Sequence, residues 1–178
     1  MEAGRARQLS HRERIGLSVH RGLDKWLTPL GIWMMRRTQG GLAQGRLARM
    51  LGAPRDVHVL LLTTRGHRSG KTRTVILQFF PDGEEMIITA ANDGGSSHPS
   101  WYFNLKSDPS ARVEIMGRVI QVRAEELPAD AAADWWQRIL LRSPSYELYQ
   151  RATNRTFPVL RLIPQPRPTG AVPQATET

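Results

Sequence analysis

Apolar and polar positions follow strand-like spacing from residue 57 to residue 126, and again near residue 160. The run from Val57 to Thr64 is almost continuous in apolar and β-branched residues, which is typical of a buried strand. Five further strands are expected at Arg73–Phe80, Glu84–Ala91, Ala111–Met116, Arg118–Glu126 and Phe157–Ile163. Short polar turns join most of them, including Pro81-Asp82-Gly83 and a turn at Gly117, so the pattern predicts antiparallel pairing.

Helical spacing occurs on both sides of these strands. Short helices are expected at His98–Lys106, Pro128–Leu141 and Ser143–Arg151. Residues 10–38 predict two amphipathic helices, with a break at Thr28-Pro29, where a cap residue precedes a proline. Six antiparallel strands with flanking helices predict an α+β domain built on a small barrel. We expect a helical extension over residues 1–56, the barrel domain over 57–163 and a disordered tail over 164–178, which is rich in Pro, Thr and Gln.

Charge is distributed unevenly along the chain. The formal net charge is +9. Residues 1–56 hold 11 basic and 4 acidic residues, whereas residues 57–178 hold 14 basic and 12 acidic residues. A cationic N-terminal third suits an anionic partner such as nucleic acid, a membrane surface or an acidic cofactor. Nucleic acid is the least favoured of these, because the excess lies outside the barrel and the aromatic residues are not interleaved with basic ones. We found no secretory signal and no membrane-spanning run, and we expect a cytoplasmic protein.

The composition also limits the chemistry. The sequence has no cysteine, which excludes disulfides, thiolate nucleophiles, iron–sulfur clusters and cysteine-type zinc sites. None of the five histidines has a ligand-like partner three or four residues away, so no metal site is expected. The sequence has no nucleophile-elbow motif, and the neighbouring Glu125 and Glu126 would point to opposite faces of a strand. An enzyme of this composition would therefore depend on a bound cofactor for its reactive atom.

The segment from Thr63 to Arg73 (TTRGHRSGKTR) is the densest candidate site. It has four fixed cations within nine residues, two glycines and no acid. Glycines let backbone N–H groups approach an anion, and Arg suits phosphate and carboxylate oxygens. A nucleotide P-loop is excluded, because the spacing around Gly70-Lys71-Thr72 is one residue short and a strand follows where a helix is required. The alternative is a solvated turn with a basic surface.

Two further segments are candidates for a binding site. Asn92-Asp93-Gly94-Gly95 precedes the aromatic-rich stretch HPSWYFNL, which could form the wall of a flat ring site or simply pack in the core. Tyr146 and Tyr149 share a helix face, where their phenols could donate hydrogen bonds into a site or cover an apolar seam.

Three ordered motifs, at Leu60–Leu77, Ala90–Leu105 and Pro144–Leu162, together resemble the deazaflavin-dependent nitroreductases. These reductases use coenzyme F420, and the resemblance covers about Val57 to Pro164. It implies a six-stranded split β-barrel related to FMN-binding barrels. It also implies hydride transfer from reduced F420 to a quinone or a related conjugated or nitro acceptor. Split barrels of this kind often form dimers, and some members act at the membrane face, which would make residues 10–38 a peripheral membrane contact at the inner face of the plasma membrane.

The resemblance also assigns roles to residues. The residues implied for the phosphate and oligoglutamate tail are His67, Arg68, Ser69, Lys71 and Arg73. Those implied along the deazaflavin are Arg73, Thr74, Val75, Ile76, Leu77 and Gln78. Those implied around the ring and side chain are Thr89, Ala90, Ala91, Asn92, Ser100, Trp101, Tyr102, Phe103 and Asn104, with Trp101 and Tyr102 as the aromatic wall. Tyr146 and Tyr149 would line the acceptor site and act in catalysis.

The chain departs from the family pattern at four positions. His67 replaces a basic residue, Ile76 a proline and Ser143 a third tyrosine, and Asn92 stands where some members carry a basic residue. Three alternatives remain open: an FMN-dependent oxidoreductase on the same fold, a deazaflavin enzyme that acts on another activated C=C or C=O bond, and a deazaflavin-binding protein without turnover.

Overall fold

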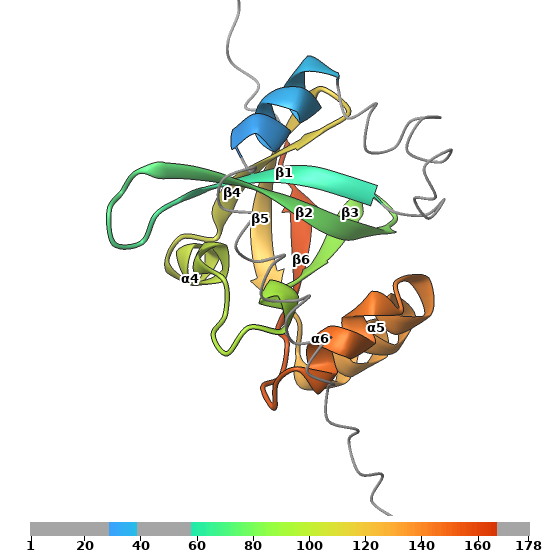
Figure 1. The fold of residues 1–178 in the computed structure, drawn as a ribbon. Coiled ribbons are helices and arrows are strands. Elements are labelled where there is room, and N and C mark those ends of the chain that lie inside the picture. The colour runs from blue at the N-terminus through green and yellow to red at the C-terminus, as the bar shows by residue number, and fades with distance from the viewer. Residues whose placement is uncertain (1–28, 39–57, 167–178) are drawn as a thin grey trace, which may run out of the picture.

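The computed structural model describes residues 29–38 and 58–166, and six antiparallel strands in it close into a barrel (Figure 1). The strands are β1 His58–Arg65, β2 Thr72–Asp82, β3 Glu85–Thr89, β4 Ser110–Ile115, β5 Arg118–Glu126 and β6 Val159–Pro164. They are hydrogen-bonded in the order β1-β2-β3-β6-β5-β4, and β4 pairs with β1 to complete the ring. The predicted six-stranded split-barrel fold is confirmed.

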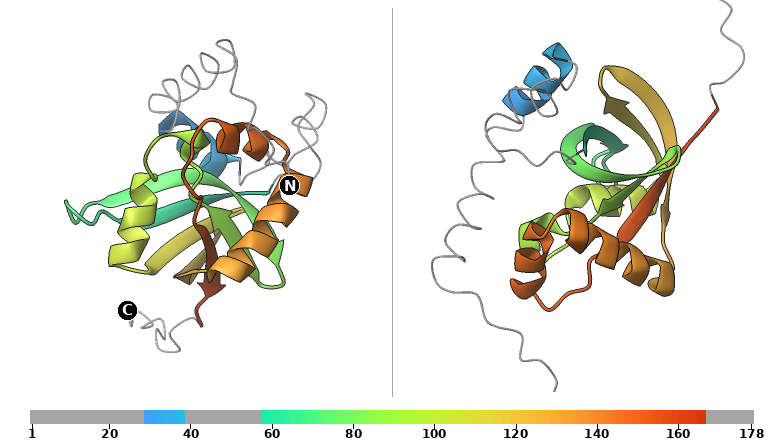
Figure 2. Two further views of the ribbon diagram at one scale, coloured as in Figure 1. Left: turned by 90° about the horizontal axis from the view of Figure 1, so that it is seen from below. Right: turned by 90° about the vertical axis from the view of Figure 1, so that its right-hand side faces the viewer.

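In the described residues four helical segments lie between strands, and one precedes the barrel. They are η1 Asn92–Gly94, α4 Ser100–Ser107, α5 Ala129–Arg142, α6 Ser145–Arg151 and, before the barrel, a helix over residues 29–37. The helix at 29–37 and the α5–α6 pair lie at opposite ends of the molecule (Figure 2). Of the helices in the described ranges, none has the length and apolar content needed to cross a bilayer.

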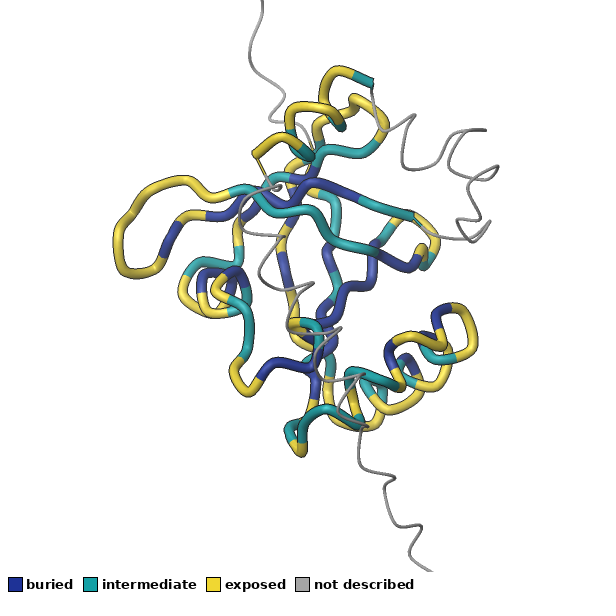
Figure 3. Tube along the Cα trace, viewed as in Figure 1, coloured by how far each residue is buried: buried dark blue, intermediate teal, exposed yellow. Residues whose placement is uncertain are grey.

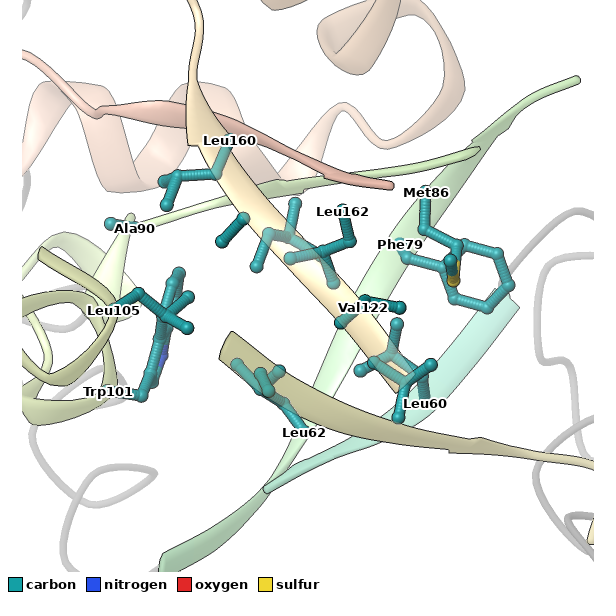
Figure 4. Packing of buried hydrophobic residues seen from close by; sticks show 14 residues of the cluster. Leu60, Leu62, Phe79, Met86, Ala90, Trp101, Leu105, Val122, Leu160 and Leu162 are labelled. Atoms are coloured by element: carbon teal, nitrogen blue, oxygen red, sulfur yellow. The ribbon is translucent and has the colours of Figure 1, made fainter. Parts of the chain in front are cut away.

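Strand alternation divides the buried residues into two clusters. Inward-facing residues such as Leu60, Leu62 and Leu162 fill the barrel, and α4 closes one end of it with Trp101 and Leu105 (Figure 4). Residues of the opposite parity pack outside the barrel against α5 and α6. This second cluster contains Phe80, Ile87, Ala91, Trp135, Ile139, Tyr146, Phe157 and Val159. Successive side chains on a strand point to opposite faces, so β2, β3 and β6 contribute to both clusters.

The turn between β2 and β3 differs from the expectation. Pro81 and Asp82 belong to β2, Asp82 pairs with Glu85, and the turn itself is Gly83-Glu84. Gly83 has a φ of 61°, which a two-residue hairpin requires and glycine adopts without strain. Pro81 is tolerated in the strand because β1, as far as it is described, pairs with β2 only from Thr72 to Phe79 and takes no hydrogen bond from residue 81.

The segment before the barrel is described only in part. Residues 29–37 are helical, and Arg36 binds Glu114 of β4 through two nitrogens at 2.9 and 2.7 Å. Leu30, Trp33 and Met34 of the helix remain exposed. The first predicted helix, the rest of the extension up to residue 57 and the predicted tail from residue 167 lie outside the described residues.

Candidate functional site

The cation-rich segment forms the exposed tip of the β1–β2 hairpin (Figure 3). Two backbone hydrogen bonds shape this tip, from Gly66 N–H to Lys71 O at 2.9 Å and from Gly70 N–H to Gly66 O at 2.7 Å. None of its four fixed cations takes part in the ion pairs found among the described residues. They are Arg65, Arg68, Lys71 and Arg73. The hairpin tip therefore presents unneutralised donors suited to an anion.

A buried amide joins this hairpin tip to α4. Asn104 is 3% exposed, and its Oδ1 accepts hydrogen bonds from the backbone N–H of His67 at 3.0 Å and from His67 Nδ1 at 2.9 Å. Its Nδ2 donates to Thr64 Oγ1 at 3.0 Å. Both ends of the Asn104 amide thus bond to the hairpin and the side chain is buried, so the structure gives it a positioning role. Because Nδ1 of His67 donates to Asn104, the ring nitrogen left for a ligand is Nε2.

Among the described residues, one edge of β2 has no strand partner over most of its length. Pairing with β3 covers only Phe80, Pro81 and Asp82, whereas β1 pairs with β2 from Thr72 to Phe79. In an antiparallel sheet alternate residues direct both backbone groups to the same neighbour. Lys71 bonds toward β1, so by parity the N–H and C=O of Thr74, Ile76 and Gln78 point to the open edge. Among the described residues no backbone group bonds to them there.

The side chains beyond this edge come from β3 and from the junction of α5 and α6. Gln78 Nε2 donates to Ser143 Oγ at 2.7 Å, which ties β2 to that junction. Thr89, on the outer face of β3, has a buried hydroxyl with no hydrogen-bond partner among the described residues. A buried hydroxyl without a partner is costly, and a ligand carbonyl or hydroxyl could satisfy it.

Tyr146 and Tyr149 lie on α6 against this region, with ring centroids 5.4 Å apart. Tyr146 is 9% exposed and packs edge-on against Phe80 at 6.2 Å. Burial, followed by the charges of Tyr149 and Asp93, raises the pKa of Tyr146 far above its usual value. This phenol therefore stays protonated and can donate a hydrogen bond, but it does not serve as a base. Tyr149 is half-buried and reaches closer to the surface.

The expected aromatic wall is only partly accessible. Trp101 is 6% exposed and belongs to the barrel core, so its ring has a packing role. Tyr102 is half-buried, and its hydroxyl donates to Glu126 Oε2 at 3.0 Å. Phe103 is 42% exposed and lies 6.1 Å from the His67 ring, centroid to centroid. Of the predicted wall, Tyr102 therefore reaches the surface and Trp101 does not, and the neighbouring Phe103 is exposed.

Arg155, which the sequence analysis did not single out, organises the segment from Ala90 to His98. Its guanidinium donates to Ala90 O at 3.0 Å, to Ala91 O and to Gly95 O at 2.7 Å. It also donates to Nδ1 of His98 at 2.8 Å. The position of Arg155 in the third family motif could have marked it as a candidate site residue. Its hydrogen-bond partners are 57 to 65 residues away in the sequence, so the sequence pattern does not indicate its role.

These groups form a donor set rather than a metal centre, and the described residues contain no cluster of His, Asp or Glu able to hold a metal ion. Cations lie at one end, open backbone groups in the middle, and Gln78, Thr89 and two phenols at the other. A strand advances about 3.3 Å per residue, so Arg73 and Gln78 lie roughly 17 Å apart. This arrangement fits an elongated coenzyme with an anionic tail and a hydrogen-bonding ring. On that evidence the residues fit F420.

Comparisons with known proteins agree on one group. Residues 31–164 match the model of a protein family described as F420H(2)-dependent quinone reductase. The F420H(2)-dependent quinone reductase Rv1261c of Mycobacterium tuberculosis is 34% identical over 122 residues, which are 66% of this chain and 80% of that one. A solved F420-H2 dependent reductase, FDR-A, is 34% identical with a TM-score of 0.53, covering 58% of this chain and 92% of that one. A chain solved as a domain-swapped dimer is 32% identical with a TM-score of 0.54, covering 74% and 98%.

Proposed function

The chain belongs to the F420H2-dependent quinone reductase family, and from that premise we propose that it transfers a hydride from reduced coenzyme F420 to a quinone-type acceptor. The open edge of β2 carries this proposal, because it connects a hairpin tip of unpaired cations with the region of Tyr146 and Tyr149. When bound, the reduced deazaflavin supplies two electrons and a hydrogen as hydride.

The residues of the chain would bind and orient the two reactants. Arg68, Lys71 and Arg73 offer charge-assisted hydrogen bonds to the phosphate and carboxylates of the tail. The backbone of Thr74, Ile76 and Gln78 offers alternating donors and acceptors to the polar edge of the ring. The hydroxyl of Thr89 would gain the partner that it lacks in the described part of the chain.

The two phenols would act on the acceptor side. A quinone that receives a hydride becomes an oxyanion, which needs a hydrogen-bond donor and then a proton. Tyr146 remains protonated because burial raises its pKa, so it can donate such a bond. Tyr149 lies beside it and is nearer the solvent, from which a proton can be replaced. The two tyrosines would therefore bind the reacting oxygen and Tyr149 would deliver the proton.

Titration of the purified protein with oxidised F420, and separately with FMN, tests the cofactor. Coenzyme fluorescence reports binding, and Arg68→Ala and Arg73→Ala should weaken F420 binding about threefold to thirtyfold each, since charged hydrogen bonds contribute roughly 0.5–2 kcal/mol when partly exposed. Arg118→Ala, at the start of β5, is the matched control and should leave binding unchanged. Binding of FMN with indifference to F420 would overturn the proposal.

Steady-state assays with a soluble quinone and reduced F420 then test turnover. We expect Tyr149→Phe to lower kcat while leaving the affinity for F420 intact, because the residue serves the acceptor. A wild-type protein that binds F420 tightly and reduces no quinone would be a carrier of the coenzyme and not a reductase.

We also propose that the helix over 29–37 contacts an anionic membrane surface, where a hydrophobic quinone resides. Leu30, Trp33 and Met34 share one face of this helix and are 53%, 60% and 38% exposed. At the same end, Met116 and Val119 of the β4–β5 hairpin are 64% and 57% exposed. An exposed Trp among apolar residues on a cationic chain is typical of a helix that lies in the membrane interface.

Flotation with anionic and with neutral vesicles tests this contact. The wild-type protein should float with anionic vesicles, and Trp33→Ser should reduce the bound fraction severalfold. Leu141→Ser is the matched control, because Leu141 is 85% exposed but lies on α5 at the other end of the molecule. Equal flotation of the two variants, or none of the wild type, would contradict the membrane contact.

A further inference from the structure

Arg155 is half-buried between the end of β3, the loop that follows it and α4. Its guanidinium reaches three backbone carbonyls and one ring nitrogen, and it stacks on Phe157 with its central carbon 4.5 Å from the ring centroid. In the described part of the chain no ion pair of Arg155 is found. Four of the five N–H donors of this guanidinium serve backbone carbonyls and a histidine, so the side chain organises a segment of chain and one donor remains for a ligand.

The segment it organises has an unusual backbone. Asn92, Asp93 and Gly94 have φ values of 50°, 48° and 68°, which makes three successive residues left-handed. Two of these are not glycine, so the turn is strained and persists only where its surroundings hold it. Arg155 binds the carbonyls of Ala90 and Ala91 just before this turn and that of Gly95 just after it. The same side chain therefore fixes both ends of the strained turn.

The turn is also pressed against the helix that carries the two tyrosines. A Cβ placed on Gly94 would meet Tyr149 O at 2.7 Å and Ala152 Cβ at 2.8 Å. The contact leaves no room for the turn to move toward α6. A change in the turn would accordingly displace α6, and with it Tyr146 and Tyr149.

His98 is held on the other side of Arg155. Arginine can only donate, so Nδ1 of His98 accepts and carries no proton. Burial, and next the charge of Arg155, lower the pKa of His98 below its ordinary value, which favours the same neutral state. The His98 ring packs on Tyr102 and Phe103, with centroids 4.9 and 6.1 Å away, and so links Arg155 to the accessible aromatic residues of α4.

We propose that Arg155 is a positioning residue that holds the turn Asn92–Gly94 and the His98 ring in the conformation that receives the deazaflavin. The inference rests on the proposed F420 site, because this segment adjoins Thr89, the β3 residue with the unpartnered hydroxyl. Arg155 does not touch the reacting atoms. Its loss leaves three carbonyls and one imidazole without their donor and releases a strained turn beside the ring site.

Removal of the side chain in the full-length protein tests this role. Arg155→Ala should weaken binding of oxidised F420 by about tenfold to a hundredfold, in line with the effect of misplacing a preorganised site. Guanidinium ion, added well below denaturing concentrations, should restore part of the affinity, whereas ammonium ion should not. Arg138→Ala is the control, because Arg138 also stacks on an aromatic ring, at 5.0 Å from Trp135, but lies on α5 and is exposed.

Amide hydrogen exchange provides a measurement that needs no coenzyme. We expect faster exchange at residues 91–98 in Arg155→Ala, with unchanged exchange in β1, β4 and β5. Suppose that the wild type binds F420. The role of Arg155 is then refuted, while the proposed function stands, if Arg155→Ala binds F420 as tightly as the wild type. It is refuted likewise if residues 91–98 exchange at the same rate in the variant and the wild type. If the wild type does not bind F420, the proposed function fails, and with it the assignment of Arg155 to a coenzyme site, whatever the exchange data show.

Discussion

Replacing Asn104 with alanine removes three hydrogen bonds that join α4 to the β1–β2 hairpin. Each such bond contributes about 0.5–1.5 kcal/mol, and a buried hydroxyl left without its partner costs roughly 1–3 kcal/mol. Thr64, which receives the amide N–H of Asn104, is only 3% exposed, whereas His67 is exposed and can turn to water. The higher helix propensity of alanine returns about 0.5 kcal/mol. The free energy of unfolding should therefore fall by about 2–3 kcal/mol.

Urea denaturation followed by circular dichroism measures this loss, and the titration with F420 measures its consequence for the hairpin tip. Gln137→Ala, an exposed amide on α5, is the control and should change the free energy of unfolding by less than about 0.5 kcal/mol. F420 should bind Asn104→Ala more weakly than wild type, because His67 and its neighbours lose their anchor. A loss below about 0.5 kcal/mol would refute the energetic reasoning. If the free energy of unfolding falls by the expected amount but the affinity for F420 is unchanged, the link between Asn104 and the coenzyme site is refuted.

Three further outcomes are expected. Gly94→Ala should destabilise the protein by about 3 kcal/mol or more in urea denaturation, because the added Cβ would overlap α6. Gly83→Ala is the control: Gly83 has a similar φ but open space around it, so the cost should be about 1 kcal/mol. A double-mutant cycle on Arg36 and Glu114, measured as free energies of unfolding, should give a coupling of about 0.5–1 kcal/mol, because the Arg36 side chain is 46% exposed. A coupling of zero would mean that this ion pair does not hold the helix over 29–37. Folding lowers the pKa of His98 from 6.5, so its contribution to stability should be complete above about pH 6.5 and disappear as the pH falls through the folded pKa. If the free energy of unfolding of His98→Asn depends on pH as that of the wild type does, this reasoning is contradicted.

The barrel was largely predictable from local patterns. All six predicted strands are present, because runs of β-branched and apolar residues separated by glycine turns allow little else. The error at Pro81-Asp82-Gly83 arose from treating proline as a turn residue. In the barrel it occupies a position where β1 has already ended, which no local pattern records.

The site was predictable as a list of segments but not as a set of roles. Cations and glycines in one turn indicate an anion site, and the structure places them together at an exposed hairpin tip. The roles of Asn104, Trp101 and Arg155 depend on partners that lie far away in the sequence, at separations of 37 and 40 residues for Asn104. An Arg in the polar stretch TNRT is expected to be a solvated loop residue, and only the folded chain brings backbone carbonyls around it.

The unequal lengths of β2 and β3 explain why a site forms at this place on the barrel. β2 has 11 residues and β3 has 5, and β3 pairs with β2 at only three positions while its other edge pairs with β6. An unpaired strand edge is a liability that proteins usually protect with charge, bulges or a covering element. Here the exposed cations lie at only one end, and the edge beside Gln78 is bordered by groups that a ring could bond. A ligand bound along this edge would complete its hydrogen bonding and stabilise the fold in proportion to its saturation, by about 2.7 kcal/mol at a hundred times its Kd. The proposed F420 site would account for the edge of β2 that no strand pairs with among the described residues.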